Sequence, residues 1–76
     1  MIKPPTPTEL RYLNTIQQFQ KENSYIPTGV ELAEELSLTH QAIYVMLRKL
    51  ERKGWIIKEH NKLSNLTLKA LKFVNL

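Results

Sequence analysis

The stretch that decides the fold runs from Tyr25 to Gly54 and reads "YIPTGVELAEELSLTHQAIYVMLRKLERKG". Apolar residues recur every three to four positions on both sides of the short sequence "SLT", which is the spacing of amphipathic helices. Acidic residues gather before "SLT" and basic residues gather after it. The stretch therefore predicts two helices that are joined by a tight turn and differ in charge.

Capping signals mark where three helices begin. Thr28 and Glu31 have the spacing of a capping box, in which each side chain binds the backbone amide of the other residue. Thr6 and Glu9 repeat this pattern near the N-terminus, and Thr39 follows "SL" as a single cap. The predicted helices cover residues 7–22, 29–36 and 39–53, after an extended arm at 1–5.

Each predicted helix has one apolar side, and together these sides form the predicted core. We expect Leu38 to anchor the turn, and Met46 to help bury the third helix beside its apolar stripe. The apolar positions are Leu10, Tyr12, Leu13, Ile16 and Phe19, then Leu32, Ala33 and Leu36, then Ile43, Leu47 and Leu50.

The residues after Gly54 predict a β-hairpin. "WIIKE" and "NLTLK" are β-prone runs, and the polar "HNKLS" between them favours a turn, so the hairpin covers residues 55–69. The tail at 70–76 either forms a short helix or extends the strand. "YIP" can be no more than an edge strand, because proline ends it. The expected fold is α+β, one domain of three helices followed by a hairpin.

Length and composition narrow the classes of function. A chain of 76 residues supports one core, and the absence of cysteine excludes disulfides and cysteine-based zinc fingers. No apolar run reaches the length of a membrane span, so we expect a soluble intracellular protein of the cytoplasm or nucleoid, or of a host cell if a virus or plasmid encodes it. With neither Asp nor Cys in the chain, we find no pair of catalytic groups and expect no enzyme.

The basic charge lies in the C-terminal half of the chain. Residues 1–38 carry three basic and five acidic side chains, whereas residues 39–76 carry eight basic and two acidic ones. On the third helix, the side opposite the apolar stripe holds no acid and consists of Gln41, Tyr44, Val45, Arg48, Lys49 and Arg52. Two helices with a tight turn and such a side indicate a helix-turn-helix that binds nucleic acid.

The sequence "IPTGVELAEELSLTHQAIYVMLRKLERKGWI" resembles the DNA-binding domain of LexA-type repressors. In that family, Pro-Thr before the second helix is followed by Glu, an aliphatic residue and Ala, here Pro27, Thr28, Glu31, Leu32 and Ala33. The ending "RKLERKGWI" and the hairpin are similar to winged-helix regulators, including the MarR-like group. The resemblance covers about residues 6–69 and implies a winged helix-turn-helix that binds duplex DNA and represses transcription in a prokaryote, virus or plasmid.

The resemblance also implies which residues contact DNA. Gln41 suits adenine, Val45 suits a thymine methyl, and Arg48 suits guanine or a phosphate. Base contacts fall on His40, Gln41, Tyr44, Val45 and Arg48. Backbone contacts fall on Thr28, Thr39, Lys49, Arg52 and Lys53. The wing residues His60, Asn61 and Lys62 are placed at the minor groove or backbone.

The sequence departs from the LexA pattern in three ways. Ser37 stands where such turns often have Gly, and the turn is one residue shorter, as in the MarR-like spacing. The chain also contains nothing that could be the Ser–Lys self-cleaving domain of LexA, so self-cleavage is not carried over. We expect no small-molecule ligand and no cofactor, and a metal site would need a third ligand besides His40 and His60.

Other interpretations of the same residues remain open. Tyr44 could lean on the core, Trp55 is expected in the core, and Arg52 and Lys53 could be a solvated last turn. The whole domain could instead bind a protein, or bind DNA without sequence preference in replication or DNA architecture. We also expect a homodimer, at least on DNA. The apolar tail either folds back on an exposed side of the first helix of its own chain or crosses to the first helix of another chain. The residues in question are Leu71, Phe73, Val74 and Leu76 in the tail, with Tyr12 and Phe19 on the helix.

Overall fold

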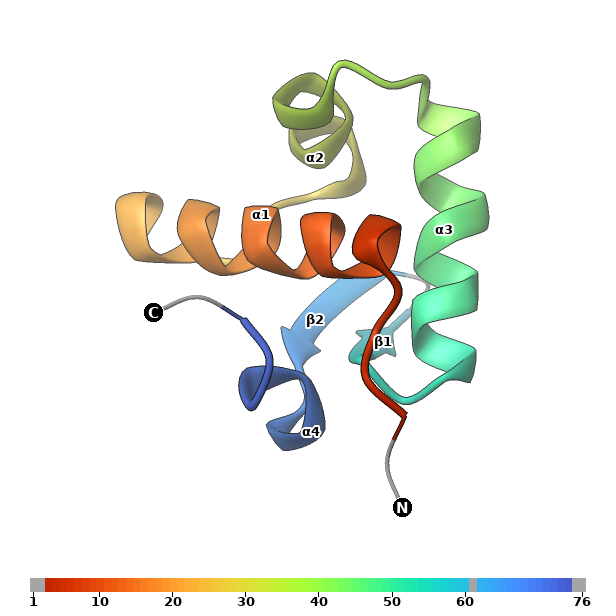
Figure 1. The fold of residues 1–76 in the computed structure, drawn as a ribbon. Coiled ribbons are helices and arrows are strands. Elements are labelled where there is room, and N and C mark those ends of the chain that lie inside the picture. The colour runs from red at the N-terminus through yellow and green to blue at the C-terminus, as the bar shows by residue number, and fades with distance from the viewer. Residues whose placement is uncertain (1–2, 61, 75–76) are drawn as a thin grey trace.

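The computed structural model describes residues 3–60 and 62–74 and contains helices followed by a hairpin. In Figure 1, α1 and α2 lie side by side, α3 stands beside both, and the hairpin and α4 lie below α1. This is the winged helix-turn-helix layout that the sequence predicts, in the α+β class. The elements are α1 (Pro7–Asn23), α2 (Gly29–Leu36), α3 (His40–Arg52), β1 (Ile56–Glu59), β2 (Lys62–Leu66) and α4 (Leu68–Leu71).

The helices begin at the predicted caps. The Thr6 hydroxyl accepts a hydrogen bond from the Glu9 amide at 3.1 Å, and the Glu9 carboxylate accepts one from the Thr6 amide at 2.9 Å. Thr28 and Glu31 make the same reciprocal pair at 3.2 and 3.0 Å. The Thr39 hydroxyl accepts from the amide of Ala42 at 3.2 Å. Amides that a helix leaves unpaired at its N-terminus are thereby satisfied.

The turn between α2 and α3 consists of residues 37–39. Ser37 has φ 55°, the left-handed conformation that glycine would adopt more easily, and the amide of Leu38 donates to the Ala33 carbonyl at 3.0 Å. The prediction that Leu38 anchors this turn is wrong, because its side chain is 39% exposed. The turn is held instead by this backbone hydrogen bond and by the left-handed conformation of Ser37.

The core lies where the three helices meet the hairpin. Ile43 and Leu50 of α3 have no exposed surface, and Trp55 is 2% exposed, which confirms its predicted place in the core. Met46 is half-buried against the same cluster. The other buried apolar residues of the cluster are Tyr12, Leu13, Ile16, Leu32, Ala33, Leu36, Leu47, Ile56, Leu63, Leu66, Ala70 and Val74.

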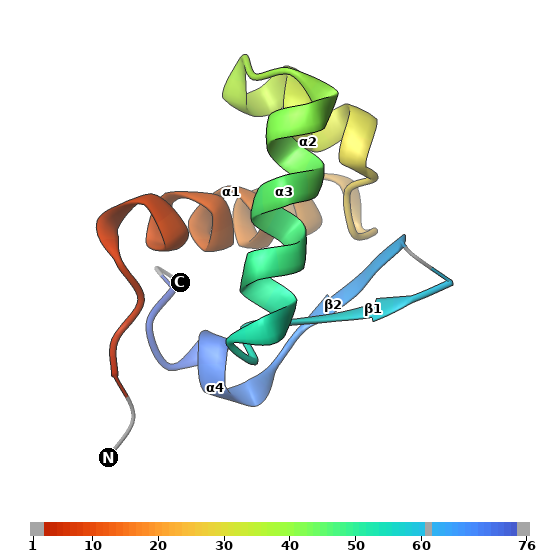
Figure 2. The ribbon, with the colours of Figure 1, turned by 90° about the vertical axis from the view of Figure 1, so that its right-hand side faces the viewer.

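The hairpin is antiparallel and projects to one side of α3 (Figure 2). Ile56 lies opposite Leu66, and Glu59 lies opposite Lys62. The predicted second strand, "NLTLK", lies three residues too far along the chain, since β2 is Lys62–Leu66 and α4 follows. The strand ends there because Thr67 begins the next helix: its hydroxyl caps α4 and also donates to the Gly54 carbonyl at 2.7 Å. "YIP" forms no strand in the described part of the chain.

The tail returns to the core of its own chain. Val74 is 7% exposed, and the ring of Phe73 packs edge-on against Trp55 with 5.7 Å between ring centroids. Tyr12 and Phe19 are 4% and 7% exposed, so the prediction that they lie on an exposed side of the first helix is wrong. Leu76 lies outside the described residues. Phe73 and Val74 are therefore part of the fold rather than a free apolar segment.

An ion pair joins the beginning of α1 to the end of α3. The Lys53 ammonium lies 2.6 Å from the Glu9 carboxylate, whose side chain is only 3% exposed. Burial by itself raises the pKa of Glu9, but the hydrogen bond and charge of Lys53 together with the Thr6 amide lower the pKa below its ordinary value. Glu9 thus combines a helix cap with an interhelical contact.

We expect Lys53→Met to lower the free energy of unfolding by about 1–2 kcal/mol, because it leaves the Glu9 carboxylate buried without its cation. The loss should be smaller in a Glu9→Gln background, and urea unfolding of the four variants measures this coupling. Because the folded pKa of Glu9 is lowered, its contribution is full above about pH 4.5 and is lost on further acidification. Glu9→Gln should flatten that acid dependence. Equal losses in both backgrounds would contradict the ion pair.

Replacing each of the two glycines with alanine should change the free energy of unfolding in opposite directions. A Cβ on Gly29 would meet the Tyr44 ring at 3.7–3.8 Å, an ordinary contact, so Gly29→Ala should raise the free energy of unfolding by about 0.4–1 kcal/mol. Gly54 has φ 83°, so Gly54→Ala should lower it by about 1–2 kcal/mol through backbone strain. Tryptophan fluorescence during urea unfolding reports both. A gain at Gly54 would show that its conformation is not required.

Candidate nucleic-acid interface

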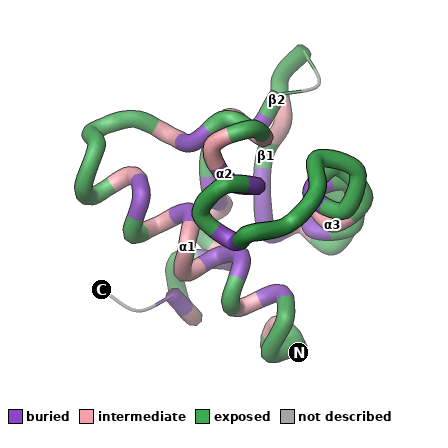
Figure 3. Tube along the Cα trace, turned by 90° about the horizontal axis from the view of Figure 1, so that it is seen from above, coloured by how far each residue is buried: buried purple, intermediate pink, exposed green. Residues whose placement is uncertain are grey.

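The outward side of α3 is open to solvent. Val45 is 64% exposed and Tyr44 is 52% exposed, and the side chains of His40, Gln41 and Arg48 are exposed as well. Figure 3 shows α3 at one edge of the molecule. All five predicted base-contacting residues are therefore accessible on one helix. Tyr44 does not lean into the core.

A hollow lies between α3 and α1. From α3 it is lined by Gln41, Ala42 and Val45, with Leu38 at the turn, and from α1 by Arg11. Sequence reasoning missed Arg11 as a candidate, because its place beside α3 depends on how α1 packs. The available signal was its position as one of three basic residues in the otherwise acidic N-terminal half. Arg11 adds a cation next to the exposed side of α3.

A second hollow lies on the other flank of α3. It is formed by the start of α2, by Tyr44 and by the hairpin, and it includes Thr28 and Lys62. The structure thus brings one predicted base contact, one predicted backbone contact and one wing residue to the same place, although they are far apart in the sequence. Figure 2 shows α3 in front, with the hairpin beside it.

The two hollows make α3 a ridge with a cation on each flank. Arg11 belongs to the α1 side, and Lys62 belongs to the hairpin side. Arg48, Lys49 and Arg52 add positive charge in the last turns of α3, and all three side chains are exposed. Such a surface attracts a polyanion that can accommodate a helix between two charged strands.

The residues predicted to contact the DNA backbone differ in whether their side chains already bind another group of the protein. Thr28 and Thr39 are exposed, but their hydroxyls accept hydrogen bonds from the helix amides that they cap. Lys53 is half-exposed and pairs with Glu9, a partner that the sequence does not reveal. Lys53 therefore has a structural role, whereas Lys49 and Arg52 are the freer cations.

At the tip of the wing, His60 is exposed and has φ 52°, which turns the chain between the strands. Lys62 begins β2 and is exposed. Asn61 lies outside the described residues. The wing therefore presents at least one histidine and one lysine to solvent beside α3.

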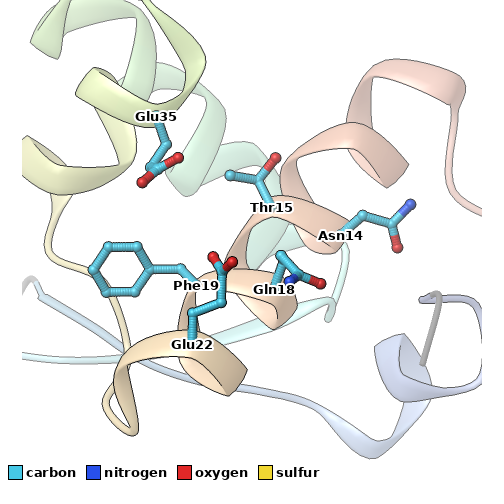
Figure 4. Close-up of a pocket in the computed structure, with 6 residues that line it drawn as sticks. All are labelled: Asn14, Thr15, Gln18, Phe19, Glu22 and Glu35. Atoms are coloured by element: carbon cyan, nitrogen blue, oxygen red, sulfur yellow. The ribbon is translucent and has the colours of Figure 1, made fainter.

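Two acidic side chains lie on another side of the molecule. Figure 4 shows a hollow between α1 and α2 in which Glu22 and Glu35 approach from the two helices. Its remaining lining residues are Asn14, Thr15, Gln18 and Phe19. Carboxylates repel phosphate, so this side is unsuited to nucleic acid. The fold therefore turns the charge separation of the sequence into two different surfaces.

No three His, Cys, Asp or Glu side chains in residues 3–60 and 62–74 gather into a group that could hold a metal ion. None of the described helices is long and apolar enough to cross a membrane.

Comparison with known proteins places the chain in a family. The family described as the DnaD N-terminal domain matches residues 6–72, which include α1, the helix-turn-helix, the wing and α4. The chain is also 29% identical over 63 residues to a LexA repressor of Oleidesulfovibrio alaskensis. That match covers 83% of this chain but only 30% of the length of the LexA repressor.

The family match extends over the helices and the hairpin alike, so it does not depend on the helix-turn-helix motif alone. The LexA likeness agrees with the resemblance seen in the Pro-Thr-x-x-Glu-Leu-Ala segment that opens α2. Both matches fit the winged helix-turn-helix fold of the structure. The chain belongs to the DnaD N-terminal domain family.

Proposed function

We propose that this protein binds duplex DNA sequence-specifically and regulates transcription, most simply as a repressor. The observation that carries the proposal is the exposed, acid-free side of α3, which stands between two hollows with Arg11 on one flank and Lys62 on the other. In the proposed complex, α3 enters the major groove and the wing lies against the neighbouring backbone or minor groove.

The dimensions of the two partners support this arrangement. The major groove is about 12 Å wide, and an α-helix with its side chains is about 10–12 Å across. A helix in the groove has a phosphate strand on each side, which corresponds to the hollows on the two flanks of α3. Gln41, Val45 and Arg48 then face base edges, while Arg11 and Lys62 face phosphates.

The comparisons support DNA binding, and the LexA relative is the one whose name specifies a repressor. This chain spans less than a third of that relative, so the repressor role is an inference for this protein. No property of the rest of the LexA repressor is transferred.

A protein-interaction module is the second candidate, and a specific observation favours it. Leu38, Tyr44 and Val45 are large apolar or aromatic side chains that are exposed on α3 and just before it. Such groups are enriched where proteins meet. DNA binding without sequence preference, as in replication or DNA architecture, is a third candidate because the same cations would serve it.

We further propose that two copies bind one site. A single recognition helix contacts only part of a recognition site, and two-fold related copies would contact half-sites roughly one or two helical turns apart. Phe73 and Val74 pack in the core of their own chain and do not supply this contact. Leu68 and Leu71 of α4 are 82% and 38% exposed, and these apolar side chains are available for it.

Gln41→Ala and Arg48→Ala should each reduce the discrimination between specific and random duplex DNA by roughly 1–3 kcal/mol, because each removes contacts to base edges. Both residues are exposed, so the fold should be preserved. Fluorescence anisotropy on a selected site and on random duplex measures the difference. Unchanged discrimination in both variants would refute the docking of α3 in the major groove.

Arg11→Ala and Lys62→Ala should weaken binding to specific and random DNA alike, because they remove phosphate contacts. Each should reduce the slope of log affinity against log salt by about one unit. Lys21→Ala is the matched control, since this exposed lysine lies in the last turn of α1, near Glu22 and away from α3. A change of base preference at Arg11 or Lys62 would show that these side chains contact bases instead.

A further inference from the structure

We infer that the first two turns of α3 recognise A·T base pairs through thymine methyl groups. Val45, Ala42 and Leu38 would form the methyl-binding surface, and Gln41 would bind the adenine. This inference rests on the proposed docking of α3 in the major groove and adds the class of DNA sequence that it selects.

The apolar surface is continuous and accessible. Val45 is 64% exposed and Leu38 is 39% exposed, and both line the same hollow as Ala42. Val45 lies four residues after Gln41 and three after Ala42, so these side chains are neighbours on the helix. Exposed methyl groups in this position match the one apolar group of the major groove, the C5-methyl of thymine.

The same half of α3 lacks the side chains that bind G·C pairs best. From Thr39 to Leu47 the sequence contains no Lys, Arg, Asp or Glu, and the first charged residue is Arg48. Guanine is most often bound by Arg or Lys, and the cytosine amino group is bound by Asp or Glu. Gln41, which lines the same hollow, instead suits the adenine N6 and N7 atoms.

The charge distribution along α3 therefore assigns different DNA contacts to its first and its last turns. Its first turns would contact A·T pairs through methyl groups and an amide, whereas Arg48, Lys49 and Arg52 in its last turns would contact guanine or phosphate. Exposed His40 precedes Gln41 and could donate to guanine, so it is a suitable control for the inference.

The experiment begins with selection of duplexes from a random pool by the full chain. Each thymine of the selected site is then replaced singly by deoxyuracil, which removes the methyl group and keeps the base pairing. At thymines facing the first turns of α3, binding should weaken about three- to five-fold, as expected for one buried methyl group. At other thymines, binding should be unchanged.

Variants identify the side chains responsible. Val45→Ala should abolish the deoxyuracil effect at one thymine, while Val30→Ala, the same truncation at an exposed valine of α2, should retain it. His40→Ala should also retain it. Gln41→Ala should relax the preference for adenine in the adjacent pair. Circular dichroism confirms that each exposed-site variant remains folded.

The outcomes separate this inference from the proposed function. A selected site that is G·C-rich under α3, or full affinity after every deoxyuracil replacement, would overturn the methyl inference and leave sequence-specific binding intact. Loss of the effect in His40→Ala rather than Val45→Ala would also overturn it. Failure to select any sequence would remove the proposed function, and the inference with it.

Discussion

The short turn between α2 and α3 is the constraint on which the rest of the structure depends. Residues 37–39 are the whole connection between the two helices, so the chain changes direction within three residues. Ser37 makes this possible by adopting the left-handed conformation, with φ 55°. The turn sets the direction in which α3 leaves α2. The helix buries Ile43, Leu47 and Leu50 against the shared core. Its opposite side, with Val45 64% exposed, stays open to solvent.

The C-terminal end of α3 is held by different interactions. Lys53 pairs with Glu9, and the Trp55 amide donates to the Leu50 carbonyl at 2.9 Å as the chain leaves α3. Lys69 donates to the Lys53 carbonyl at 2.7 Å and lies 4.3 Å from the centroid of the Trp55 ring. The N-terminal cap of α1, the end of α3 and α4 are thus tied together. These contacts fix where the hairpin leaves the core, and hence where the wing lies.

Function and stability make different demands on α3. Val45 and Tyr44 would contribute more to stability if buried, and their exposure gains nothing for the isolated fold. The same exposure provides shape and methyl groups for a partner that fits around a helix. Charge is arranged in the same way, because Glu22 and Glu35 lie between α1 and α2 while the cations flank α3. A surface of this kind is more consistent with binding than with solubility alone.

Local sequence determined the features that depend on a few neighbouring residues. Capping boxes at Thr6 and Thr28 mark the helix starts because their hydrogen bonds span only three residues. Helical periodicity separates the buried Ile43 from the exposed Val45, so the accessible side of α3 could be listed from sequence. The family resemblance supplied the winged layout, which the hairpin confirms.

Tertiary structure alone decided the contacts between distant segments. The pairing of Lys53 with Glu9, the place of Arg11 beside α3 and the return of Val74 to the core depend on how whole helices pack, and no local pattern encodes that. The β-prone residues continue to Lys69, but the strand ends before Thr67. The Thr67 hydroxyl caps α4 and donates a hydrogen bond to the carbonyl of Gly54, thirteen positions away in the sequence. Sequence therefore determined which side chains of α3 are available, and packing decided which cations surround them.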